Sequence, residues 1–180
     1  MRVLIPFLLA FALVSCAEKS SDVSHLDIEN IEKSLFKNPN SISDSLKLVA
    51  FEAYNEFSTK HPKDEMSPEY LFRAANISRS FKKYDEAIRI YQRIVDLYPA
   101  YNMVTESHFL IAFVYDSDLN DKEKASAIYE QVAKKYPNEK FGKEAAMRLE
   151  TIHLTDEELM DMFRKKNPEL KMKKDSTSNS

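Results

Sequence analysis

Apolar residues recur along most of this chain with the spacing of one helix face, and the clearest such stripe appears three times before a proline. An apolar residue stands five positions before each proline, a tyrosine eight before it and an alanine twelve before it. The three sets are Ala50, Tyr54 and Pro62; Ala87, Tyr91 and Pro99; and Ala125, Tyr129 and Pro137. Positions i, i+4 and i+7 share a helix face, and proline ends a helix because it lacks an N–H. The pattern predicts three helices that end near these prolines, with all nine residues contributing to the packing of the repeats.

Further helices are predicted before, between and after these stripes. A helix is expected to begin at Pro68, because proline is tolerated in a first turn and Leu71, Ala74 and Ala75 give an apolar face. Similar faces predict helices over 104–115 and 141–152. An earlier helix over 26–36 is expected to pair with one over 45–61.

A last helix is predicted from a capping box, in which Thr155 is followed three residues later by Glu158. It is expected to run to about residue 167 with Leu159, Met162 and Phe163 as its apolar stripe. Terminal repeats need a polar-faced seal, so we expect this helix to cap the array. A helix offered to a partner is the alternative.

The first residues have the pattern of an export signal. A basic Arg2 precedes an apolar run over 3–14, which is shorter than the ~20 residues needed to span a bilayer. Ser15 is a small residue that fits a cleavage site. Cys16, the only cysteine, would then begin the mature chain.

The segment Leu13-Val14-Ser15-Cys16 resembles the lipobox of bacterial lipoproteins. That resemblance implies cleavage after Ser15 and acylation of both the thiol and the new amine of Cys16. An ordinary export signal followed by an incidental cysteine is the alternative. Ala17 takes the place where aspartate retains enterobacterial lipoproteins in the inner membrane. We therefore expect a lipid anchor in the outer membrane, on its periplasmic face.

These signals divide the chain into four parts. Residues 1–15 are expected to be the signal peptide, and 16–25 the lipidated cysteine with a flexible tether. Residues 26–168 are expected to form one helical repeat domain, and 169–180 a disordered polar tail.

The composition argues against several classes of function. Twenty-six basic and 29 acidic side chains give a net charge of −3, so nothing favours nucleic acid. Gly142 is the only glycine, which excludes glycine-rich phosphate loops. The four histidines are scattered, and 116–121 lacks the glycine and glutamate of a calcium loop. We expect no metal, no cofactor, no catalytic residues and no enzyme activity.

The helix–turn–helix units, with small residues, then alanine, an aromatic and a closing proline, resemble tetratricopeptide repeats. The unit over 68–99 matches, and so does that over about 105–137, which carries one extra residue in its inner turn. The resemblance implies an all-α superhelical array of about three helix pairs plus a C-terminal capping helix. The period of 37–38 residues is similar to that of two envelope families, the outer-membrane assembly lipoprotein BamD and the Tol–Pal accessory protein CpoB (YbgF).

We interpret the chain as a protein-interaction scaffold of the bacterial envelope, acting in outer-membrane protein assembly. A Tol–Pal or cell-division adaptor is one alternative, and an envelope enzyme with a helical accessory domain is another. Outward positions on the first helix of each pair are the candidate contacts for envelope proteins or peptides. They are Arg73, Asn76, Arg79, His108, Lys143 and Arg148. Several of them are basic, which favours an acidic or C-terminal carboxylate peptide, although each could be ordinary solvated surface.

Overall fold

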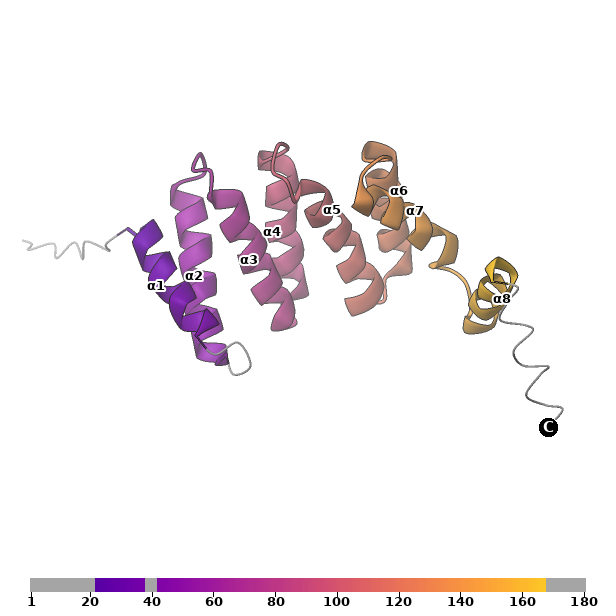
Figure 1. Ribbon diagram of the computed structural model, residues 1–180, viewed down its shortest axis with the longest axis horizontal. Coiled ribbons are helices and arrows are strands. Elements are labelled where there is room, and N and C mark those ends of the chain that lie inside the picture. Colours follow the sequence, from indigo (N-terminus) through magenta and orange to yellow (C-terminus); the bar gives the residue numbers. More distant parts are fainter. Residues whose placement is uncertain (1–21, 38–41, 168–180) are drawn as a thin grey trace, which may run out of the picture.

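The computed structural model describes residues 22–37 and 42–167, and this part of the chain is all-helical. The helices are α1 (His25–Phe36), α2 (Asp44–Lys60), α3 (Ser67–Ser80), α4 (Tyr84–Leu97), α5 (Val104–Phe113), α6 (Lys122–Lys135), α7 (Lys140–Thr151) and α8 (Asp156–Lys166). A π-helical turn, η2 (Val114–Asp118), directly follows α5. Figure 1 shows the helices in a row, with α1 at one end and α8 at the other.

Successive helices from α1 to α7 form stacked pairs, as expected of a tetratricopeptide array. α1 pairs with α2, α3 with α4, and α5 with α6, while α7 packs on α6 and α5. We call α1, α3, α5 and α7 the first helices and α2, α4 and α6 the second helices. No single pair can bury its apolar face alone, so stacking completes the core. The predicted all-α repeat fold is confirmed.

The alanine and tyrosine stripes lie at the centre of this packing. Ala50, Ala87 and Ala125 are completely buried, and Tyr54, Tyr91 and Tyr129 are at most 2% exposed. Burying a side chain of this size stabilises a fold by about 1.5–3 kcal/mol. Small alanines let neighbouring helices approach closely, and the tyrosine rings fill the space that remains.

The three prolines behave differently from the rest of their stripes. Each is exposed and stands just after a helix end, so the prolines terminate second helices and do not take part in the packing we expected of them. The residue before the proline packs instead. Tyr98 lies partly buried, and its hydroxyl donates to the Pro62 carbonyl 2.9 Å away, which joins the ends of two successive second helices.

The inner turns of two pairs each contain one residue with a left-handed backbone. Lys82 (φ 59°) and Asn120 (φ 53°) are left-handed and stand five residues before equivalent alanines. The second turn contains one extra residue, and there the helix widens into η2, in which the Leu119 amide donates to the Val114 carbonyl at 2.9 Å. A π-helical turn accommodates an inserted residue without ending the helix.

The folded domain begins earlier than residue 26. Asp22 pairs with Lys60 at 2.9 Å, and the His25 ring nitrogens lie 3.1 Å from Tyr70 Oη and 3.1 Å from Asp64 Oδ2. Residues 22–25 are therefore docked on α2 and α3 and are not part of a free tether. The signal segment with Ser15 and Cys16, and the tail over 169–180, lie outside the described residues.

The C-terminal helix forms but does not seal the array. Thr155 and Glu158 make the predicted capping box. Within the described chain, however, α8 has no buried residue, and Leu159 and Phe163 are 40% and 52% exposed. α8 stands beyond the end of α7 (Figure 1), and Leu159 and Phe163 of its apolar stripe do not reach the core of the array.

Gly142 explains how α7 approaches the preceding turn so closely. It is buried, and a Cβ built on it would lie 1.7 Å from the carbonyl oxygen of Tyr136. A backbone atom at that distance cannot move aside without displacing the end of α6.

We expect Gly142→Ala to lower the free energy of unfolding by about 1–3 kcal/mol, the usual cost of overpacking, despite the ~1 kcal/mol gain in helix propensity. Denaturant unfolding followed by circular dichroism measures this. Lys143→Ala, at an exposed position of the same helix, should stay within about 0.5 kcal/mol of wild type. Unchanged or increased stability of Gly142→Ala would contradict the close approach.

Candidate functional site

Each buried stripe tyrosine directs its hydroxyl to a polar side chain on the first-helix segment of its own pair. The pairs are Tyr54 with Glu32 (2.9 Å), Tyr91 with Asn76 (2.7 Å) and Tyr129 with Asp116 (3.3 Å). Burial is the main reason that the pKa of each tyrosine is raised. The hydroxyls therefore stay protonated and act as hydrogen-bond donors.

Arg73 of α3 connects the first two pairs. Its guanidinium forms an ion pair with Glu32 of α1 and donates from Nε to Glu69 at 2.8 Å. The Tyr101 hydroxyl also donates to Glu69, at 2.6 Å. Burial acts to raise the pKa of Glu69, but the hydrogen bonds from Tyr101 and Arg73 outweigh it and hold the pKa below its usual range. Glu69 thus remains charged beside Arg73.

The carboxylates of η2 connect the later pairs. Arg79 of α3 donates from Nε to Asp118 at 2.6 Å, and Arg148 of α7 lies 4.0 Å from Asp116. The two guanidinium groups also lie over the ring of Phe113, at 4.7 and 5.6 Å from its centroid, where cation–π attraction adds to the ion pairs. We call the contacts of Arg73 with Glu32, Arg79 with Asp118 and Arg148 with Asp116 the arginine ties.

The arginine ties change the interpretation of the predicted contact residues. Arg73, Arg79 and Arg148 already face carboxylates, so they do not form a free basic surface. Asn76 is exposed but accepts the Tyr91 hydroxyl. Lys143 is exposed on α7. Of the predicted basic contacts, Lys143 therefore remains exposed for an acidic or C-terminal carboxylate ligand, whereas the three arginines are already paired.

His108 does not face outward at all. It is only 7% exposed, its ring packs edge-on against Tyr136, and Nδ1 has no hydrogen-bond partner among the described residues. Burial lowers the pKa of His108; Lys135 adds to this effect, and Asp96 opposes it. The predicted role in partner contact is therefore wrong for this residue, because α5 turns it into the interior.

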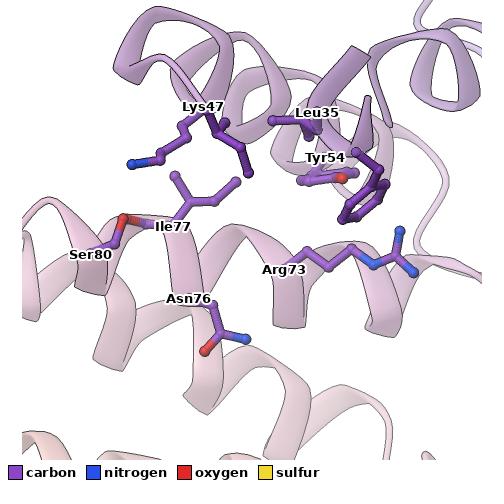
Figure 2. A pocket seen from close by; sticks show the side chains of 9 residues that line it. Leu35, Lys47, Tyr54, Arg73, Asn76, Ile77 and Ser80 are labelled. Carbon is purple, nitrogen blue, oxygen red and sulfur yellow. The ribbon is translucent and has the colours of Figure 1, made fainter. Parts of the chain in front are cut away.

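An open apolar pocket lies between the first pair and α3, with a volume of about 410 Å³. Leu35 and Tyr54 on one side face Ile77 and Arg73 on the other (Figure 2). The remaining lining residues are Phe36, Ile42, Lys47, Asn76 and Ser80. An apolar floor with a few polar groups at the rim suits the insertion of apolar side chains from a partner.

Sequence reasoning placed Arg73 and Asn76 in this region but missed the pocket. Leu35 and Ile77 follow the ordinary spacing of an apolar helix face. That spacing does not show whether α1 and α3 pack tightly together or leave a pocket between them. Phe36, at 64% exposure, is the one residue whose apolar character at the end of a helix could have indicated an open surface.

The described part of the chain offers no obvious place for a metal ion. Across residues 22–37 and 42–167, histidine, aspartate and glutamate side chains do not gather in groups of three or more that could hold one. None of the described helices combines the length and apolar character that crossing a bilayer requires.

We expect the buried His108 to make the fold sensitive to acid. Its folded pKa lies below the unfolded value of about 6.5. Below that pH the unfolded chain binds more protons, so stability falls as pH falls. His108→Phe should remove up to about 1.4 kcal/mol of the stability difference between pH 7.5 and pH 5.5.

Denaturant unfolding at the two pH values measures this effect. His153→Gln changes an exposed histidine and should keep the wild-type difference. An identical pH dependence in His108→Phe and the wild type would show that another group causes the acid sensitivity.

Comparison with known proteins agrees with this architecture. The family described as "Tetratricopeptide repeat" matches residues 69–101 and 106–139. These ranges contain α4 and α6 with their Ala–Tyr stripes and most of α3 and α5.

One characterised relative is the outer membrane protein assembly factor BamD of Rickettsia prowazekii (strain Madrid E). It is 27% identical over 131 residues, which covers 66% of this chain and 52% of the relative. The chain thus spans about half the length of that relative. The chain thus contains two segments that match the tetratricopeptide repeat, and it is distantly similar to BamD.

Proposed function

We propose that this protein is a lipid-anchored scaffold of the bacterial envelope that binds other envelope proteins in outer-membrane protein assembly. The observation that carries this proposal is the similarity of its repeat array to an outer-membrane assembly factor. Tetratricopeptide repeats mediate protein–protein contacts, and the open pocket of the first pair offers a place for one. The scaffold needs no catalytic activity of its own.

The proposed anchor is an acylated Cys16 that follows cleavage after Ser15. One acyl chain holds a protein to a membrane only marginally, whereas two or more, at about 0.8 kcal/mol per buried CH₂, hold it stably. Only residues 17–21 separate the proposed anchor from Asp22, which pairs with Lys60 of α2. The array would then lie close to the periplasmic face of the outer membrane.

Binding at the pocket would be driven by apolar contact. The arginine ties pair Arg73, Arg79 and Arg148 with carboxylates of the fold, so a partner segment at the pocket gains little from placing acidic residues beside Arg73. An apolar side chain that inserts between Leu35 and Ile77 would be desolvated there. The polar rim would orient the rest of the segment.

We expect Ile77→Glu to abolish recovery of partner proteins, because it places a charge in the apolar floor of the pocket. The measurement is crosslinking in intact cells followed by purification from detergent-solubilised envelopes. Leu97→Glu changes a 58%-exposed residue on α4 outside the pocket and should recover the wild-type partners. Recovery of β-barrel insertase subunits supports the proposal, whereas peptidoglycan-associated partners would favour the Tol–Pal or cell-division alternative.

Cys16→Ser should remove the anchor. Wild-type protein is expected to incorporate labelled palmitate and to sediment with outer membranes, and the variant to do neither. Palmitate labelling that survives in Cys16→Ser would contradict the assignment of the lipid to this residue.

A further inference from the structure

The helix α8 presents an apolar face for which the described chain provides no cover. Leu159, Met160 and Phe163 are 40%, 50% and 52% exposed, and α8 stands apart from the row of helices (Figure 1). An isolated helix of 11 residues is marginal in water and needs packing to persist. This face therefore indicates an interaction surface.

The opposite side of α8 is already directed at its own chain. Glu158, Met162 and Lys165 line a hollow with Glu150 and Leu154. An ion pair of 3.2 Å between Lys166 and Glu150 also holds α8 near α7. The exposed stripe therefore points outward while α8 keeps its place at the end of the array.

The charges at the two ends of α8 are complementary to each other. Its first turn is acidic, with Asp156, Glu157 and Glu158, and its last turn is basic, with Arg164, Lys165 and Lys166. We propose that α8 is a self-association element that packs antiparallel against α8 of a second copy of this chain. The acidic end of each helix then lies beside the basic end of the other, with the two apolar stripes between them.

This charge pattern favours a second copy over a membrane surface. An anionic bilayer would attract the basic turn but repel the acidic one, whereas an antiparallel copy satisfies both turns at once. A two-fold interface is self-complementary in this way. Two helices of this length make a small interface of the transient class. Burial of the apolar stripes provides the attraction, because exposed charge pairs contribute little free energy. The charge pairs mainly determine that the two helices lie antiparallel.

A photocrosslinker in the full-length protein tests the contact directly. Benzoylphenylalanine at position 160 should give an adduct of twice the chain mass, in which peptide mapping joins α8 to α8. The same group at position 97, exposed on α4, should not. An adduct to another protein, to lipid or within one chain would overturn the proposal, as would the absence of any adduct.

Charge reversal tests the antiparallel arrangement in the same assay. Asp156→Lys with Glu157→Lys makes both ends of α8 basic, and Arg164→Glu puts an acidic group at the basic end. Thr155 and Glu158 keep the capping box, and Lys165 stays unchanged in the hollow beside α7. Each variant alone should lower the adduct about fivefold. The two variants co-expressed should restore it. Full adduct in either variant alone, or no restoration on mixing, would overturn the arrangement.

Discussion

A buried tyrosine hydroxyl needs a hydrogen-bond partner, and this requirement shapes much of the array. Tyr54, Tyr91 and Tyr129 each fill the space between helices, and a hydroxyl left unsatisfied there would cost about 1–3 kcal/mol. The first-helix segment of each of these three pairs therefore carries an acceptor beside the tyrosine hydroxyl. Two of these acceptors, Glu32 and Asp116, are carboxylates, which in turn need a cation.

The cations that balance these carboxylates come from the next helix pair or helix along the array. Glu32 forms an ion pair with Arg73 of α3, and Asp116 forms one with Arg148 of α7. The same sequence of tyrosine, carboxylate and arginine thus occurs at both ends of the array, across successive first helices. In the middle Asn76 takes the place of the carboxylate and needs no cation, and Arg79 of α3 pairs with Asp118 of η2. The buried tyrosines and the ion pairs therefore stabilise the same contacts between successive helices.

The residues that hold the array together differ from those that we assign to partner binding. The arginines that were predicted to contact a ligand are paired within the fold, and the apolar pocket beside the first pair is the surface that we assign to a partner. At the other end, α8 keeps an exposed stripe. The two ends of the array therefore offer two different kinds of contact, one concave and one helical.

The sequence predicted the helices well because stripes such as Ala87 and Tyr91 report local periodicity, which the fold preserves. It also located the extra residue in the inner turn of the second unit, where the structure has the π-helical turn η2. It could not show that His108 turns inward or that Arg79 meets Asp118, since these depend on how helices distant in sequence are stacked. The exposure of α8 was missed for the same reason: a capping box specifies where a helix begins, not what it packs on.

The most direct test of the central claim is a double-mutant cycle of Glu32→Gln and Arg73→Met, measured as the free energy of unfolding. If the tie joins the first two pairs, the coupling energy should be about 1–2 kcal/mol. The exposed pair of Glu29 and Lys33 on α1, 2.7 Å apart, should give about 0.3–0.5 kcal/mol in the same kind of cycle. A coupling between Glu32 and Arg73 no larger than that of the surface pair would contradict the account.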